Sequence, residues 1–322
     1  MDSLDIRILR ELSQDVALLP GRPGIRVSYW ALSRTLSVSE GTIRNRLRKM
    51  RSSGLILGSR KFPNPALLDL RWAAYGMDAS NNIPKRDVID TLRLVDGVLV
   101  VQNHHSNFVG IIFVYEDQDA LTRILKLFRG IAGASGEGIL SRIFFPSTDF
   151  LPTLQDWQLI YHIAKEDLRS YKQLAQKFGL PLRTLESKLS KMEETRAIFS
   201  FPQVNISAMR AGVPADLIVL FVSPEVRSES ESEILSLLND YLFYVGATWV
   251  DHGLYSLILP NALTASDLRE RVRKVQGVKM ARIELVDEHH DQIEVMASYV
   301  RRRIALLEAT TRHRGNARLH KG

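Results

Sequence analysis

The chain has 322 residues, of which 45% are hydrophobic and 25% charged, and this composition is that of a folded protein rather than a disordered polymer. Its length favours two or more domains. The absence of cysteine excludes disulfide bonds, thiolate metal sites and cysteine nucleophiles, and the apolar runs are too short to span a bilayer. Because the start at Met1 is acidic and lacks an apolar run, we expect no secretory signal, and we expect a cytoplasmic protein.

The basic residues concentrate in two regions of a chain whose formal net charge is +7. Residues 30–62 hold eight basic side chains against the single acid Glu40. Residues 301–322 hold seven against Glu308. Clustered Lys and Arg neutralise phosphates and release condensed counterions, so a polyanion is the first partner to consider. The alternative is a solvated basic face that only aids solubility.

Two segments of the chain resemble each other. Residues 31–50 align with residues 173–192 without a gap, and Phe-Pro follows each segment before a strand-rich stretch of similar length. We therefore expect a tandem arrangement in which two helical units alternate with two strand-rich units. The expected boundaries are residues 1–62, 63–149, 150–205 and 206–290, with a C-terminal helix and basic tail in 291–322.

The first helical unit is predicted to contain three helices. The apolar spacing indicates a helix over residues 4–14, and Ser28 and Ser39 are suitable N-caps for two more, the last of which ends before Gly54. Prolines and glycines in residues 18–24 predict a loop. The three-residue turn 37–39 is typical of a helix-turn-helix, and residues 55–62 would follow as an extended wing.

Each strand-rich unit has the element order β-α-β-β-α-β. In the first unit we expect strands at 72–77, 98–103, 108–115 and 139–145, with helices at 85–95 and 119–129. In the second we expect strands at 217–222, 245–251, 255–259 and 278–286, with helices at 231–241 and 266–275. The predicted fold class is α+β, with two winged helix-turn-helix domains alternating with two ferredoxin-like domains. A last helix spans 293–307, and residues 310–322 are expected to form a disordered basic tail.

The third helix of the first unit has a face suited to DNA. Ile43, Leu47 and Met50 form the stripe that should be buried. The opposite face combines arginine, which can pair bidentately with guanine, and asparagine, which can pair with adenine. Because helix-turn-helix spacing, basic excess and a wing coincide, we favour contact with double-stranded DNA over a merely solvated face. The predicted DNA-binding residues are Ser28, Arg34, Ser39, Gly41, Thr42, Arg44, Asn45, Arg48, Lys49, Arg60 and Lys61.

The second copy of this helix is less suited to reading phosphates. Glu186, Ser187 and Ser190 stand at the positions of Arg44, Asn45 and Arg48. The sequence leaves two readings open for it, a weaker DNA contact or a unit retained for packing.

These segments resemble a known family. Residues 4–12, 32–50 and 53–56 are similar to the Lrp/AsnC transcription regulators. The resemblance implies a winged helix-turn-helix joined to a ferredoxin-like domain that dimerises and often binds amino acids. This chain would be a tandem fusion that forms a pseudo-dimer within one chain, assembles further into homo-oligomers and holds a small-molecule effector between its two ferredoxin-like domains.

The chain departs from the family at the turn beside the effector pocket. The family often has a Gly-x-Tyr-Asp-like turn, but Val109 and Ser256 occupy the position of the Asp. A free α-amino acid is therefore disfavoured, because no carboxylate is present to pair with its ammonium group. Histidines stand at these turns instead, and we expect His104, His105 and His252 to bind any effector.

The same histidines raise an enzymatic alternative. A branch that resembles Lrp/AsnC regulators consists of siroheme decarboxylases, whose catalytic histidines lie at the same strand turn. No His-x-Tyr-Asn pattern is present at either turn, and an enzyme does not need a strongly basic recognition helix. We therefore expect a sequence-specific DNA-binding transcription regulator rather than an enzyme, with no cofactor and no metal. An interaction scaffold with vestigial DNA-binding units is a third class.

Overall fold

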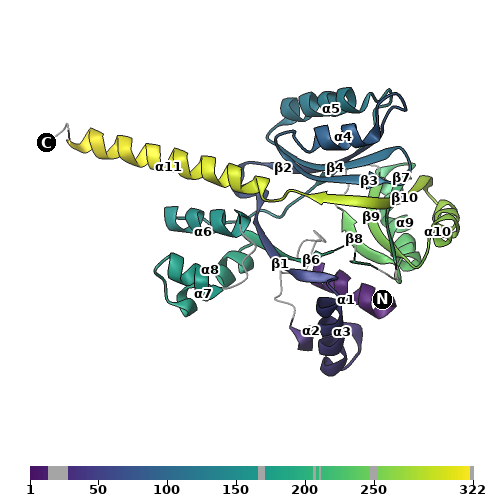
Figure 1. Cartoon of the computed structure of the whole chain (residues 1–322), viewed down its shortest axis with the longest axis horizontal. Helices are drawn as coiled ribbons and strands as arrows, with labels where there is room; N and C mark the ends of the chain where they lie inside the picture. Colours follow the sequence, from purple (N-terminus) through teal and green to yellow (C-terminus); the bar gives the residue numbers. More distant parts are fainter. Residues whose placement is uncertain (14–27, 166–170, 206–207, 210–211, 247–251, 320–322) are drawn as a thin grey trace.

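The computed structural model describes residues 1–13, 28–165, 171–205, 208–209, 212–246 and 252–319. The chain folds as an α+β protein in which helices and strands alternate (Figure 1). The loop expected at residues 18–24 lies outside the described residues. Within the described part of the chain, no helix is long and apolar enough to cross a membrane.

The first helix-turn-helix unit, at the N-terminal end of the chain, forms from local signals. Ser28 and Ser39 cap the second and third helices by accepting hydrogen bonds from backbone N–H groups, each at 3.1 Å. Ser37 adopts a left-handed conformation with φ of 55° and makes the turn between them. The predicted stripe of Ile43, Leu47 and Met50 is confirmed as buried. The elements are α1 (Ser3–Ser13), α2 (Tyr29–Leu36), α3 (Glu40–Ser52) and β1 (Ile56–Pro63).

The first ferredoxin-like unit is preceded by a short 3-10 helix. Two helices cover one face of its antiparallel sheet, and Phe113 and Phe128 are fully buried between these layers. The strand order is β5-β2-β4-β3. The elements are η1 (Pro65–Leu68), β2 (Arg71–Asp78), α4 (Lys85–Leu92), β3 (Val98–His104), β4 (Phe108–Tyr115), α5 (Gln118–Ala132) and β5 (Ile139–Ile143).

The second half of the chain repeats this order of elements. The second helix-turn-helix unit is followed by the second ferredoxin-like unit, whose strand order β10-β7-β9-β8 matches that of the first. The helix-turn-helix elements are α6 (Leu154–Lys165), α7 (Tyr171–Lys177), α8 (Leu182–Glu194) and β6 (Ile198–Val204). The ferredoxin-like elements are β7 (Val213–Phe221), α9 (Pro224–Leu237), β8 (Leu242–Gly246), β9 (His252–Leu259), α10 (Leu263–Arg273) and β10 (Val278–Asp291).

Several elements differ from the sequence predictions; β8, for example, covers Leu242–Gly246, and residues 247–251 of the strand expected there lie outside the described residues. Helix α9 begins at Pro224 rather than at residue 231, because proline is well suited to a first helical turn although the Ser- and Glu-rich start has no apolar stripe. Strand β10 continues to Asp291 because its second half pairs with β3. The tail expected to be disordered from Thr310 is instead helical as far as Leu319, within α11 (Val295–Leu319).

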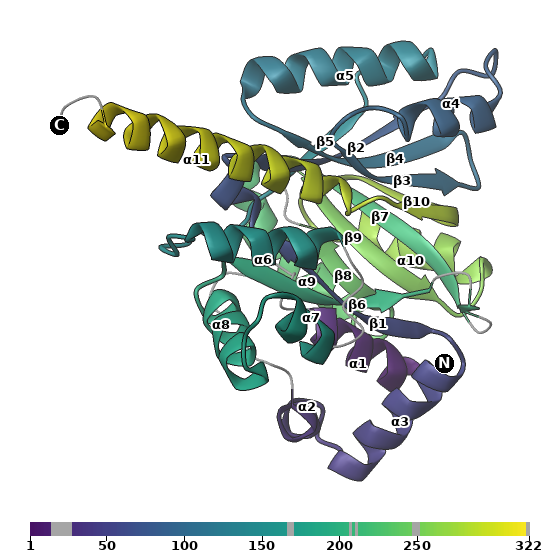
Figure 2. The same ribbon diagram turned by 60° about the vertical axis from the view of Figure 1, so that its left-hand side comes forward.

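The two ferredoxin-like units share one eight-stranded sheet. Strand β3 of the first pairs antiparallel with β10 of the second, from His104 opposite Val286 to Val100 opposite Asp291. Figure 2 shows this continuous sheet, with α4 and α5 over its first half and α9 and α10 beside its second half. Residues near this junction can therefore contact both units.

A two-stranded ribbon connects the two helix-turn-helix units. Strands β1 and β6 pair antiparallel, with Phe62 opposite Phe199. Phe62 also stacks on Trp72 of β2 at 5.3 Å between ring centroids and packs against Phe145, so the ribbon is fastened to the sheet by an aromatic cluster.

Each helix-turn-helix unit packs on elements outside its own segment of the chain. The core of the first contains Ile258 of β9 and is partly covered by Phe243 of β8, both from the second ferredoxin-like unit. The second packs through Trp157 of α6 against Val300 of α11. Each unit is thus held by elements distant from it in sequence.

Candidate nucleic-acid interface

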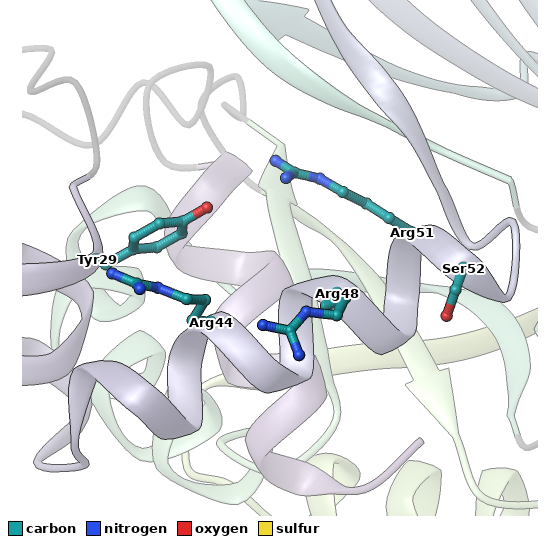
Figure 3. Close-up of a pocket in the computed structure, with 5 residues that line it drawn as sticks. All are labelled: Tyr29, Arg44, Arg48, Arg51 and Ser52. Atoms are coloured by element: carbon teal, nitrogen blue, oxygen red, sulfur yellow. The ribbon is translucent and has the colours of Figure 1, made fainter.

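The outer face of α3 carries a group of arginines. Arg44, Arg48 and Arg51 lie at successive turns and line an open hollow of about 460 Å³ together with Tyr29 and Ser52 (Figure 3). The Arg44 guanidinium lies 5.4 Å from the centroid of the Tyr29 ring. This cation–π contact positions one arginine without neutralising its charge.

These cations have no acidic partner. Within the described residues, no carboxylate lies within ion-pair distance of Arg44, Arg48, Lys49 or Arg51. Like charges three or four residues apart on a helix repel one another, so the cluster destabilises the free helix slightly. An anion bound at the hollow would relieve that repulsion. The face is therefore suited to phosphate or to the acceptor-rich edge of guanine.

The remaining arginine of this region, Arg46, has a structural role. Its guanidinium donates to Asp2 at 2.6 Å and to Asp5 at 3.2 Å, which fixes α3 against the start of α1. Burial would raise the pKa of the Asp2 carboxyl, but hydrogen bonds from the Asp5 backbone and from Arg46 lower it below its usual value. The pair thus sets the orientation of the exposed face.

The other predicted contacts lie at the N-terminal ends of α2 and α3, except Arg34, which lies in the last turn of α2. Ser28 and Ser39 are exposed caps, and Arg34 lies 5.0 Å from the ring of the exposed Trp30. At Gly41 a Cβ atom would meet only the Ser39 hydroxyl at 3.7 Å, so the fold itself leaves room for a side chain there. The structure brings these residues together with Thr42, Asn45 and the arginines on one surface.

Two predicted DNA contacts lie elsewhere. Arg60 donates to Glu294 at 2.9 Å and lies 3.5 Å from Asp291, and Lys61 donates to Glu193 and Ser200. Both side chains are largely buried. The extended segment predicted at residues 55–62 forms strand β1, but β1 pairs with β6 and its two cations lie beside acids of neighbouring elements.

Three residues of the hollow were missed by the sequence prediction: Tyr29, Arg51 and Ser52. Arg51 lies seven residues after Arg44, a spacing that places both on one helix face and was visible in the sequence. Tyr29 belongs to α2 and lines the hollow because the turn between the two helices places α2 beside α3. Its part in the site is decided by tertiary structure.

The predicted effector histidines occupy different environments. The His104 side chain is fully buried, with Nε2 3.1 Å from an Asp216 carboxylate oxygen. His252 is also buried, and its Nε2 lies 2.7 Å from the Ser141 hydroxyl. His105 is exposed, with Nδ1 3.5 Å from Asp287. The first two contacts each join one ferredoxin-like unit to the other.

Further polar contacts surround this junction. Ser256 donates to the second Asp216 oxygen at 2.9 Å, and Arg282 forms a bidentate pair with Asp78 at 2.6 and 3.0 Å. Hydrogen bonding to Arg282 lowers the pKa of Asp78. Among the described residues, no group of three or more histidine and acidic side chains is arranged to hold a metal ion.

The comparisons with known proteins agree with this geometry. Residues 1–51, which contain the arginine face of α3, match the AsnC-type helix-turn-helix domain. The N-terminal unit is thus similar to AsnC-type helix-turn-helix domains. This confirms the resemblance to Lrp/AsnC regulators and supports a DNA-binding regulator. No curated protein matches the chain.

Solved structures extend the likeness to the whole fold. The siroheme decarboxylase NirDL aligns over 95% of this chain and 100% of its own length, with 13% sequence identity and a TM-score of 0.53. The same enzyme in complex with an iron-uroporphyrin III analogue aligns over 94% and 98%, with 13% identity and a TM-score of 0.52. A Neisseria meningitidis transcriptional regulator in complex with L-Met covers 47% of this chain and 96% of its own, with 16% identity and a TM-score of 0.29. The first two matches show a shared fold.

Proposed function

We propose that the chain is a sequence-specific, DNA-binding transcription regulator of Lrp/AsnC type. The observation that carries the proposal is the uncompensated basic face of α3 within an AsnC-type domain. A cluster of arginines without acids is costly unless an anion neutralises it, and DNA supplies both phosphates and guanine acceptors.

In this proposal each part of the surface has a role. Helix α3 lies in the major groove, where Arg44, Asn45 and Arg48 face base edges. The capping hydroxyls of Ser28 and Ser39, with Arg34 and Lys49, contact flanking phosphates and set the orientation. Gly41 and Thr42 lie at the start of α3, where the helix approaches the backbone of the duplex most closely.

A gel-shift or fluorescence-anisotropy titration with the protein's own promoter fragment tests this proposal. Arg44→Ala with Arg48→Ala should weaken binding by on the order of tenfold or more for each lost base contact. The matched control removes two exposed cations of α8, Arg183→Ala with Lys191→Ala, and should change affinity much less. Equal losses in both double variants would contradict the assignment to α3.

The ferredoxin-like units form an intrachain pseudo-dimer in this proposal, and the chains assemble into homo-oligomers. An effector would bind between the two units, near His104, His105 and His252. The support is that His104 and His252 already lie at contacts between the units. An anionic effector suits imidazole groups, which become charged donors near neutral pH.

A thermal-shift screen tests the effector proposal. An anionic ligand should stabilise the wild-type protein, and His105→Ala should reduce its response because this exposed imidazole is free to move toward a ligand. Stabilisation by ordinary amino acids that persists unchanged in His105→Ala would contradict it.

A second candidate function is that of a siroheme decarboxylase, which the shared fold over the full chain favours. One observation favours the regulator: Arg44, Arg48 and Arg51 of α3 have no acidic partner among the described residues, and DNA phosphates would neutralise them. Tetrapyrrole absorption by the purified protein, together with CO2 release from added siroheme, would decide for the enzyme.

A further inference from the structure

The two helix-turn-helix units share one internal anchor. In the first, carboxylates at the start of α1 bind Arg46 of α3. In the second, Asp156 at the start of α6 binds Lys188 of α8 at 2.8 Å. Residues 46 and 188 are aligned by the repeat, so the same contact holds the third helix of each unit in place. A difference between the units must therefore lie on their outer faces.

The outer faces carry different charges. Helix α3 contains five basic residues and one acid, whereas α8 contains three of each. Glu186 is exposed at the position of Arg44, and Glu193, at the position of Arg51, accepts hydrogen bonds from Lys61 and Ser200. Exposed acids repel phosphates, and α8 has no cluster of uncompensated arginines in their place.

The helix starts differ as well. Ser39 caps α3 with its hydroxyl, but Pro181 stands at the start of α8 and forms no side-chain cap. Proline also has no backbone N–H to offer to a phosphate. Leu182, which follows it, is 42% exposed. The start of α8 thus lacks a capping hydroxyl and begins with two apolar residues, and its first exposed cation is Arg183.

From these differences we infer that each chain reads a single DNA half-site through α3, and that α8 does not contact DNA. The inference rests on the proposed function and specifies the DNA that is bound. One chain should bind an asymmetric site, although the fold has two similarly built halves. A palindromic operator would require two chains, each supplying one α3.

Selection from a random duplex library tests the inference, combined with native mass spectrometry of the bound complex. The expected result is an enriched motif with one half-site for each bound chain. A palindrome occupied by two chains also supports the inference, whereas a palindrome occupied by one chain overturns it. Failure to enrich any motif would count against the proposed DNA-binding function itself, so the two failures are distinguishable.

Substitutions that place α3 residues on α8 of the full chain provide a second test. Glu186→Arg, Ser187→Asn and Ser190→Arg together place on α8 the three residues that face base edges on α3. On a duplex with two half-sites spaced about 10 base pairs apart, this variant should extend the footprint of one chain to both half-sites. The wild-type chain should protect one. If wild type already protects both, and Glu186→Arg alone changes nothing, α8 reads DNA and the inference is wrong.

Discussion

At the scale of single residues, some positions of the interface stabilise the fold and others remain available to a ligand. Arg46 and Arg48 are two residues apart on α3. Arg46 pairs with two carboxylates, while Arg48 has no acidic partner among the described residues. Composition alone cannot distinguish them, because the distinction depends on which side of the helix faces α1.

Gly41 provides a prediction in which stability and binding change in opposite directions. Its surroundings leave room for a methyl group, and alanine favours helix by about 0.5–1 kcal/mol relative to glycine. Gly41→Ala should therefore raise the free energy of unfolding while weakening DNA binding, since the methyl group keeps the duplex at a distance. Denaturant titration and anisotropy measure the two effects. Unchanged affinity would mean that α3 does not approach DNA closely at this position.

Asp156 provides a prediction for pH. Burial would raise the pKa of its carboxyl, but hydrogen bonds from Lys188 and Thr153 hold the pKa below its usual value. A carboxyl whose pKa is lower in the folded state than in the unfolded state stabilises the protein at pH values above its unfolded pKa of about 4. This stabilisation is lost as the pH falls through the folded-state pKa.

Asp156→Asn should therefore lower the free energy of unfolding at neutral pH by about 1–2 kcal/mol and flatten the loss of stability below roughly pH 4. Chemical denaturation across that pH range is the measurement. Glu194→Gln, at an exposed position of α8, is the control and should leave the profile unchanged.

At the scale of elements, the strand expected as a wing, β1, forms a ribbon with β6. Its cations neutralise acids inside the protein, and its aromatic residues pack on the sheet. Phe62 is 1% exposed, so Phe62→Ala should lower the free energy of unfolding by about 3–5 kcal/mol. Thermal unfolding tests this, with Leu57→Ala on the same strand as the exposed control. A small loss at Phe62 would show that the ribbon is not fastened there.

Helix α11 carries the second basic region. It packs through Val300 on the core of the second helix-turn-helix unit and then extends to Leu319, away from the rest of the chain (Figure 1). Deleting residues 312–322 removes four basic residues and leaves that packing intact.

If this segment contacts phosphates, the deletion should reduce the slope of log affinity against log salt by about 0.9 for each lost contact, while preference for the correct site stays the same. Binding titrations over a salt series test this. An unchanged slope would place the segment outside the interface.

At the scale of the whole molecule, buried polar contacts join the two ferredoxin-like units within one sheet. The His104–Asp216 contact crosses from β3 to β7, with β10 between them. His104→Ala leaves a buried carboxylate with one partner fewer, so we expect a loss of about 1–3 kcal/mol in the free energy of unfolding. His105→Ala, its exposed neighbour, should change stability by less than about 0.5 kcal/mol. Equal effects would contradict a structural role for His104.

The sequence by itself determined what depends on neighbouring residues. Capping serines, apolar periodicity and turn glycines specify helices and strands locally, so the element order, the α+β class and the buried stripe of α3 were predictable from it. The AsnC-type identity of the N-terminal unit was predictable for the same reason, because its motif lies within 51 consecutive residues.

Only the tertiary structure decided which of these residues remain available to a ligand. Arg60 and Lys61 are cations in an extended basic strand, and nothing near them in sequence shows that Glu294 and Glu193 lie beside them. The edge pairing of β3 with β10, and the burial of His104 against Asp216, likewise join residues more than 100 positions apart. Charge is a property of each residue, but its neutralisation depends on distance in space, and the fold sets that distance.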